Sequence, residues 1–324
     1  MSTVVSSRPR ALALAVAVLA MSHAASSAAD PDPVTPAIAG VVAGGIKIRL
    51  IKDGLNGSEG PIAQPDGSLL FTETRANRIV HVGLDDKISS FLENSNGSNG
   101  LAYAPGGELV SVQTVRASVG VVYPKDKAKV WVDGFESTPL RRPNDLVIDR
   151  KGGVYFTDPG PFRKADEPAS PTAVYYRTPA GELRRIATDI TWPNGIQLSP
   201  EERVLYVADT HGEFVIAYDV ADDGSVSNRR NFARLQGWNK PENGNGSSGA
   251  DGLAVDSLGH LYVASSAGIE VFDAAGKALG VIPIPGQTQN LAFAGPDKKT
   301  LYVVGGGKLY RFAVLTPGLS TRAK

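Results

Sequence analysis

One pattern recurs six times along this chain and constrains its fold more than any other feature. A polar residue introduces a short apolar segment, a turn follows, and a second apolar segment begins 10 or 11 positions after the polar residue. The clearest copy is 250–264, where the two apolar segments flank a turn containing Asp and Gly. Such a pair of segments is typical of a β-hairpin. The leading polar residues are Glu59, Asn99, Asn144, Asn194, Asp251 and Asn290.

The spacing between the copies predicts a β-propeller. Successive leading residues lie 40, 45, 50, 57 and 39 positions apart, and a period of about 40–50 residues with short paired strands is typical of propeller blades. Six copies predict an all-β, six-bladed β-propeller over residues 45–315. Residues 46–51 alternate as a strand does, and 308–314 form a third strand of the last blade with no fourth strand after it. We therefore expect the N-terminal strand to close the last blade, which removes an open sheet edge.

The propeller makes a chemical prediction about the six leading residues. The first strand of each blade lines the central channel, so residues that begin those strands should form a ring at one mouth of the channel. All six carry a side-chain oxygen, which suits a hard cation such as calcium; zinc, magnesium and manganese are the alternatives. Asn and Asp also begin strands because they tolerate turn geometry and bond nearby backbone. Turn chemistry does not explain Glu59, so we interpret the ring as a site for one divalent cation.

The second strand of each blade should return to the same mouth. Asp209 and His211 follow one such strand and are therefore expected near the ring, as supporting residues around the site. His211 is favoured in that role over the role of a catalytic base. Two longer loops, 160–171 and 236–249, should also reach this face, either as lids over the site or as solvated loops.

The first 29 residues are interpreted as an export signal rather than as part of the fold. Arg8 and Arg10 supply basic residues, 11–21 is an apolar segment too short to span a bilayer, and Ser27-Ala28-Ala29 suits a signal peptidase. A retained membrane anchor is the alternative. With the signal removed, we expect a periplasmic or secreted protein with no membrane contact.

Composition narrows the remaining possibilities. The sequence has 33 basic and 33 acidic residues and no cysteine, so disulfides, thiolate metal sites and a cysteine nucleophile are excluded. No basic block is present, so we expect no nucleic-acid partner. The Pro-rich composition after the signal predicts a linker over 30–44, and residues 316–324 are expected to form a C-terminal tail after the propeller.

Several motifs resemble those of the gluconolactonase, senescence-marker-protein and luciferin-regenerating-enzyme family. Single motifs are weak, but the ordered set covers roughly residues 55–312 and all six repeats. The motifs are Arg142-Pro143-Asn144-Asp145-Leu146, Tyr155-Phe156-Thr157-Asp158-Pro159, Pro193-Asn194-Gly195, Tyr206-Val207-Ala208-Asp209-Thr210, Asp251-Gly252-Leu253-Ala254-Val255-Asp256 and Asn290-Leu291-Ala292-Phe293.

The resemblance implies roles for individual residues. Glu59, Asn194 and Asp251 look like direct metal ligands, and Asn144 matches a residue that contacts metal or substrate. Asp251 also matches the proposed general base, and Arg142 resembles a substrate-contacting arginine. The other ring residues have no firm role in the family and are expected as supporting residues: Asn99 and Asn290.

The sequence therefore predicts metal-dependent hydrolysis of a small lactone or ester, such as a sugar-acid lactone of the gluconolactone type. The metal would polarise the carbonyl, and a carboxylate beside it would take a proton from the attacking water. Two alternatives stay open: a phosphotriesterase resembling diisopropyl-fluorophosphatase, and a non-catalytic ligand-binding propeller. Buried carboxylates that face each other argue against the binding propeller, because a binding surface has no need for them.

Overall fold

The computed structural model describes residues 1–3, 33–161, 171–242, 244, 246–322 and 324. The chain forms two units, Met1–Pro31 and Asp32–Lys324. Nearly all of the predicted export signal lies outside the described residues, as does most of the loop 160–171, so both stay predictions. Within the described ranges, no helix is long and apolar enough to cross a bilayer.

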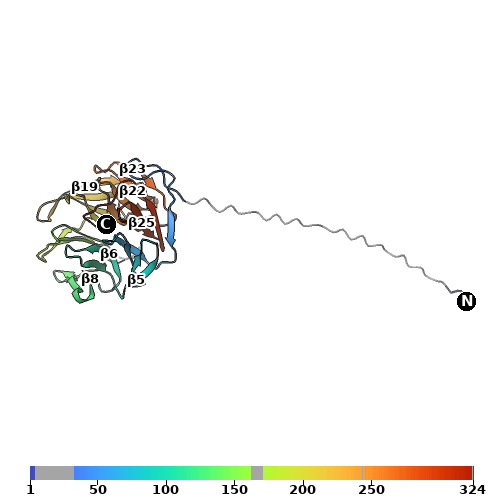
Figure 1. Ribbon diagram of the computed structural model, residues 1–324, viewed down its shortest axis with the longest axis horizontal. Coiled ribbons are helices and arrows are strands. Elements are labelled where there is room, and N and C mark those ends of the chain that lie inside the picture. Colours follow the sequence, from blue (N-terminus) through green and yellow to red (C-terminus); the bar gives the residue numbers. More distant parts are fainter. Residues whose placement is uncertain (4–32, 162–170, 243, 245, 323) are drawn as a thin grey trace. The chain divides into compact units, whose positions relative to one another are not determined.

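Six four-stranded antiparallel sheets are arranged around a common centre, which confirms the predicted six-bladed propeller (Figure 1). Blades 1 to 3 are β2 (Ser58–Ala63), β3 (Leu69–Glu73), β4 (Arg78–Val82), β5 (Ile88–Glu93); β6 (Ser98–Tyr103), β7 (Leu109–Gln113), β8 (Ser118–Tyr123), β9 (Lys129–Val132); and β12 (Leu146–Ile148), β13 (Val154–Asp158), β14 (Ala173–Arg177), β15 (Leu183–Ala187). Blades 4 to 6 are β16 (Pro193–Leu198), β17 (Val204–Asp209), β18 (Phe214–Val220), β19 (Val226–Arg234); β20 (Leu253–Val255), β21 (Leu261–Ser265), β22 (Gly268–Phe272), β23 (Ala278–Ile282); and β24 (Asn290–Ala294), β25 (Thr300–Gly305), β26 (Lys308–Ala313), β1 (Arg49–Lys52). A 3-10 turn η1 (Lys125–Lys127) precedes β9, and a small hairpin of β10 (Gly134–Phe135) and β11 (Thr138–Pro139) lies between blades 2 and 3.

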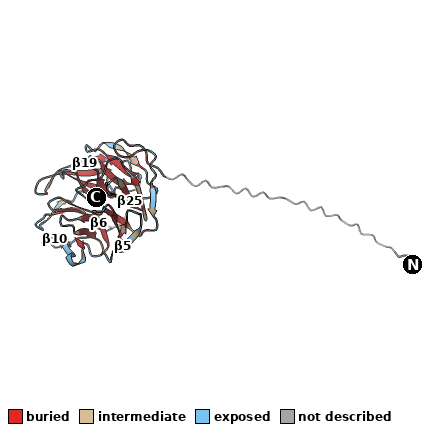
Figure 2. Cartoon of the chain, viewed as in Figure 1, coloured by how far each residue is buried: buried red, intermediate tan, exposed pale blue. Residues whose placement is uncertain are grey.

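Burial decreases from the inner strands to the outer strands of the blades. Every residue of β2 is buried, whereas β5 has a single buried residue. Figure 2 shows buried residues concentrated inside the ring of blades and exposed ones at its periphery. Apolar side chains of neighbouring blades pack together; one cluster joins Tyr155 and Tyr176 of blade 3 to Ile196 and Leu205 of blade 4. These inter-blade cores stabilise the ring through the apolar area that they remove from water.

The N-terminal strand closes the last blade, as predicted, but its bounds differ from the predicted 46–51. β1 pairs antiparallel with β26, with Leu50 opposite Tyr310. Residues 46–48 pair instead with the segment before them: Ile48 N donates to the Pro33 carbonyl at 2.8 Å. The alternation of apolar and polar residues runs through both stretches, so the pattern alone does not show where the pairing partner changes.

Two segments predicted as linker and tail are packed on the propeller. Within the expected linker 30–44, Val41 and Val42 are buried in the cluster that blades 5 and 6 share. The described residues of 316–324 are also held, since Gly318 N donates to the Lys298 carbonyl at 3.0 Å and Leu319 is buried. A few apolar side chains in each segment supply the burial, which the proline content of 30–44 did not indicate.

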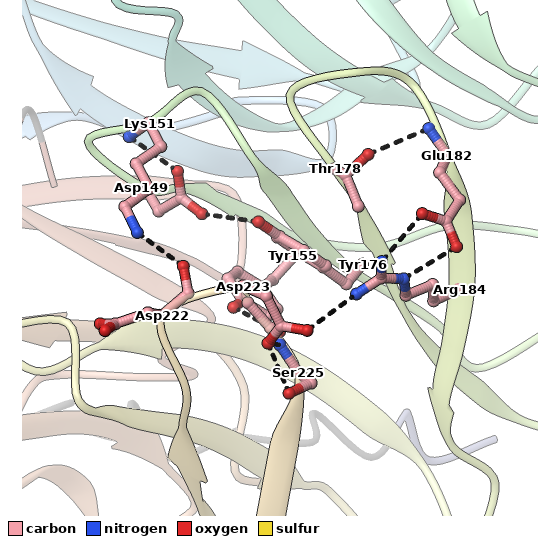
Figure 3. A network of polar contacts seen from close by, with 11 residues as sticks. Asp149, Lys151, Tyr155, Tyr176, Thr178, Glu182, Arg184, Asp222, Asp223 and Ser225 are labelled. Carbon is pink, nitrogen blue, oxygen red and sulfur yellow. Dashed lines mark hydrogen bonds and ion pairs between the residues drawn. The ribbon is translucent and has the colours of Figure 1, made fainter.

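Polar contacts join blades 3 and 4 at the end of the strands opposite to the ring of leading residues. Tyr155 donates to the Gly224 carbonyl at 2.8 Å, and Tyr176 donates to Asp149 Oδ2 at 3.1 Å. Figure 3 shows these tyrosines among carboxylates of both blades, where Arg184 contacts Glu182 and Asp223. This network holds blades 3 and 4 together and has a structural role.

Candidate active site

The six leading residues lie at equivalent places on the innermost strands. Glu59, Asn99, Asn194 and Asn290 lie within β2, β6, β16 and β24, and Asn144 and Asp251 come just before β12 and β20. Asp251 is partly exposed, and the other five are buried. In blades 1, 2 and 4 the pairing register shifts at the leading residue, for example between Glu59 and Ile62. Such bulges re-aim a side chain, so the sequence repeat directs these side chains toward the channel.

Close contacts at the glycine that follows the leading residue join four of the six leading residues to the next one around the channel. Gly252 follows Asp251, and a Cβ there would lie 2.1 Å from Asn290 Oδ1. Gly60 has a positive φ of 44°, and a Cβ there would lie 2.0 Å from the Asn99 carbonyl oxygen. Only glycine permits this approach. The same contact recurs from Gly100 to the Asn144 carbonyl and from Gly195 to the Asp251 carbonyl, through hydrogen bonds of 3.1 and 3.2 Å.

Blade 6 completes the ring through two amide side chains. Gln289 Nε2 donates to Glu59 Oε1 at 2.9 Å, and Asn290 Nδ2 donates to Glu59 Oε2 at 3.3 Å. Between blades 3 and 4, the Thr157 hydroxyl donates to the Asn194 carbonyl at 2.7 Å. The structure therefore brings all six leading residues into one closed ring.

The two carboxylates of the ring stand in an unfavourable environment for charge. Burial raises the pKa of Glu59 to about 7, against the lowering effect of the Asn290 hydrogen bond. Burial also raises the pKa of Asp251 well above its usual range, and the nearby negative charge of Glu59 adds to this effect. Two acids that oppose each other's ionisation, here the buried Glu59 and the partly exposed Asp251 with its buried Oδ1, are characteristic of functional sites, where a cation can compensate them.

Three buried oxygens of the ring accept no hydrogen bond within the described part of the chain: Asn99 Oδ1, Asn194 Oδ1 and Asp251 Oδ1. The Asn194 amide is oriented, because its Nδ2 donates to Thr210 Oγ1 at 3.0 Å. Buried acceptors normally find partners, so these oxygens suit a missing electropositive group. No three His, Cys, Asp or Glu side chains gather as a metal site in the described ranges, so a cation would need the amide oxygens. Two carboxylates with amide oxygens fit a hard divalent cation.

Arg142 lies close to the ring carboxylates. Burial lowers the pKa of its guanidinium, and the charges of Glu59 and Asp251 act in the opposite direction. Its backbone is fixed, since Arg142 N donates to Asp158 Oδ1 at 2.8 Å. The arginine predicted to contact substrate is therefore within electrostatic range of two of the predicted ligands.

Acidic residues at the ends of second strands hold backbone rather than face the channel. Asp209, expected as a supporting residue, accepts from Trp192 N at 2.8 Å and from Thr191 N at 3.2 Å. These bonds fix the segment that leads into Asn194. His211 is exposed, and its ring packs edge-on against Trp192 at 5.5 Å between centroids. Glu73, at the end of β3, accepts from Asn56 N in the same way, and Glu270, within the third strand β22, accepts from Gln236 N.

The loop 236–249 is tied down at both of its ends. Gln236 N donates to Glu270 Oε2 at 2.6 Å, and Ser248 is fully buried, with its N donating to the Thr210 carbonyl at 3.0 Å. These contacts hold both ends of the loop in place, so the segment that leads into Asp251 has a fixed position.

Sequence reasoning missed three residues around the ring. Gln289 binds Glu59 although it precedes the recurring position, Asp145 follows Asn144 where four other blades have glycine, and Lys324 reaches Asp145 from the far end of the chain. Gln289 and Asp145 each lie one position from a leading residue, and this place in the repeat was the signal in the sequence by which they could have been found. No local sequence pattern indicates that Lys324 contacts Asp145, since the two residues are 179 positions apart.

Comparison with known proteins supports the propeller fold and places the chain in a family. The model of the SMP-30/Gluconolactonase/LRE-like region matches residues 57–306, which span all six repeats. The chain belongs to this family. A gluconolactonase from Zymomonas mobilis is 29% identical over 296 residues, covering 84% of this chain and 82% of the relative. The lactonase drp35 of Staphylococcus saprophyticus is 29% identical over 255 residues, covering 75% and 74%.

Solved structures of the family have the same fold. A gluconolactonase from Xanthomonas campestris superposes with a TM-score of 0.74 at 28% identity, covering 88% of this chain and 96% of that one. A calcium-binding regucalcin from Agrobacterium tumefaciens superposes with a TM-score of 0.68 at 19% identity, covering 85% and 96%. At that identity the second likeness supports the fold alone.

Proposed function

We propose that this chain is a lactonase that hydrolyses a small lactone, of the sugar-acid type, with the help of one divalent cation at the ring. The observation that carries the proposal is that the buried ring oxygens Asn194 Oδ1 and Asp251 Oδ1 have no hydrogen-bond partner among the described residues and belong to the same ring as the buried carboxylate of Glu59. Relatives named gluconolactonase and lactonase over most of this chain support the reaction class.

Glu59, Asn144, Asn194 and Asp251 would hold the cation. The charges of Glu59 and Asp251 match a divalent ion, and oxygen ligands favour calcium, with magnesium, manganese or zinc as alternatives. When bound, the cation would polarise the lactone carbonyl and favour the charge that develops on its oxygen.

Arg142 and Asn144 would orient the substrate. A guanidinium donates several hydrogen bonds in a fixed plane, which suits the carbonyl and hydroxyl oxygens of a sugar-acid lactone. The Asp158 carboxylate fixes the backbone of Arg141 and Arg142 through bonds of 2.8 Å, so the Arg142 side chain starts from a fixed point.

Asp251 would take a proton from the attacking water. Water oxygen then bonds to the carbonyl carbon, the ring C–O bond breaks, and the released oxygen receives a proton, which yields a hydroxy acid. The raised pKa of Asp251 makes its carboxylate a stronger base than an exposed aspartate. Cation binding lowers that pKa again, so the assignment requires that one carboxylate oxygen stays available to water.

Asp251→Asn tests the role of this carboxylate, with Asn194→Asp as the matched control on the neighbouring blade. Asparagine keeps one ligand oxygen and removes the proton acceptor. At metal concentrations that give full occupancy, measured on the same samples, Asp251→Asn should lose about 10²–10⁴-fold in kcat, and Asn194→Asp should lose less. Full activity of Asp251→Asn at saturating metal would refute the base assignment.

A further inference from the structure

The last residues of the sequence cross the channel end opposite to the ring. Arg322 is half-buried there, and its guanidinium donates to Gln197 Oε1, to the Leu198 carbonyl and to the Ser199 carbonyl, each at 2.7 Å. Three bonds to one strand end fix this segment on blade 4. Figure 1 shows the C-terminal end of the chain near the centre of the ring of blades.

A cavity of about 380 Å³ lies where this segment meets the inner strands. Its wall includes Ile62, Leu101 and Gln197 from three different blades, together with Arg322 and Lys324. It also includes turns that join first and second strands, which lie at the far ends of the strands from the ring. Arg322 and Lys324 therefore line the part of the central channel that lies away from the ring.

Lys324 continues from this anchor into the channel and meets Asp145. Lys324 Nζ lies 2.6 Å from Asp145 Oδ2, and the side chains are 6% and 0% exposed. The other oxygen, Asp145 Oδ1, accepts from Leu146 N at 2.9 Å, and Asp145 N donates to Thr157 Oγ1 at 3.2 Å. Both oxygens of the Asp145 carboxylate therefore have partners, and the ion pair is buried.

The ion pair of Asp145 and Lys324 lies next to the ring. Asp145 directly follows the ring residue Asn144, and its N–H donates to the Thr157 hydroxyl, which donates to the carbonyl of the ring residue Asn194. Because the pair is buried, its charges act on a cation at the ring with little screening by salt.

Among the described residues, Glu59, Asp251, Asp145 and Lys324 sum to a formal charge of −2, and Arg142 adds a positive charge that stays the same in all the variants below. Removing Lys324 would make the channel more negative by one charge, and removing the charge of Asp145 would make it less negative by one.

We propose that Lys324 is a charge-balancing residue of the cation site: it neutralises Asp145 and so sets the affinity of the ring for one divalent cation. This inference rests on the proposed cation site and adds to it a residue 265 positions away from Glu59 in the sequence. Lys324 acts through Asp145 and needs no contact with substrate.

Four proteins that cover three channel charges test the inference: wild type, Lys324→Met with one more negative charge, Asp145→Asn with one fewer, and the double variant with the charge of the wild type. Dissociation constants for Ca²⁺, and separately Mn²⁺, would be measured by calorimetry on chelator-treated protein. A unit charge in a channel of effective dielectric constant about 20 should change Kd at least about tenfold. We expect tighter binding for Lys324→Met, weaker binding for Asp145→Asn, and wild-type affinity for the double variant.

The order of affinities separates charge balance from mere support of the fold. If the pair were only structural, each single variant would weaken binding and the double variant would not restore it, which would overturn the inference. Should Lys324→Met fail to fold because Asp145 is left buried and unpaired, the comparison of wild type, Asp145→Asn and double variant still decides. A wild-type protein that binds neither cation would remove the proposed cation site and this inference together, whereas wild-type binding with no charge order would remove the inference alone.

Discussion

Removing the charge of Glu59 should change how the stability of the metal-free protein depends on pH. Glu59 is 7% exposed, and burial raises its pKa from an ordinary 4.5 to about 7. The unfolded chain releases this proton near pH 4.5, but the folded protein keeps it until about pH 7. The folded state therefore binds more protons between these values, and its stability falls as pH rises through that window.

The size of the effect follows from the two pKa values. One pKa unit corresponds to about 1.4 kcal/mol, so ionising Glu59 costs the metal-free fold about 3 kcal/mol between pH 4.5 and 7. For a domain of this size, that loss lowers the melting temperature by roughly 5–10 °C. A bound divalent cation compensates the charge, so saturating metal should restore the melting temperature at pH 7.5.

Thermal unfolding of chelator-treated protein from pH 4.5 to 7.5 measures this loss. Glu59→Gln stays neutral throughout, so its melting temperature should lose the part of the pH dependence that Glu59 contributes, while the part from Asp251, whose pKa burial also raises, remains. Glu182→Gln is the control, because Glu182 is an exposed acid whose contact with Arg184 lies far from the ring. A wild-type slope that is flat, or that Glu59→Gln leaves unchanged, would refute the reasoning about this carboxylate.

Two further predictions concern the ends of the propeller. Deleting residues 46–52 should cause unfolding or aggregation, because it removes β1 and exposes the edge of β26; a deletion variant with an unchanged melting temperature would show that the strand is dispensable. We also propose export to the periplasm or the outside of the cell, with a mature protein that starts near Asp30, and an N-terminal sequence still beginning at Met1 in the exported fraction would contradict it.

Much of the fold could be predicted because the sequence repeats its own geometry. The polar residue that leads each repeat, the turn and the second apolar segment recur at a nearly constant offset, so finding one blade locates the next. The ring followed from the same register, because equivalent positions on first strands must meet around the channel. Closure by β1 followed from the unpaired third strand of the last blade.

What the pattern left out depends on contacts between distant residues. Arg322 and Gln197 are 125 positions apart, and Lys324 and Asp145 are 179 apart, so no local periodicity signals either pair. The expected linker was misjudged for a related reason: proline-rich composition describes the backbone, but burial of Val41 and Val42 decides the outcome. The role of Asp209 as a backbone acceptor required the position of Trp192 N, which sequence spacing does not give.

The central claim is that buried ring oxygens and a divalent cation together hydrolyse a lactone. The most direct test is hydrolysis of aldonolactones by chelator-treated protein, before and after adding back Ca²⁺, Mg²⁺, Mn²⁺ or Zn²⁺, with metal content measured by elemental analysis and with aryl esters and phosphotriesters as comparison substrates. We predict that activity on a lactone is lost with the metal and returns with about one equivalent of cation per chain. Full lactone hydrolysis by metal-free protein, or hydrolysis of phosphotriesters alone, would contradict this account.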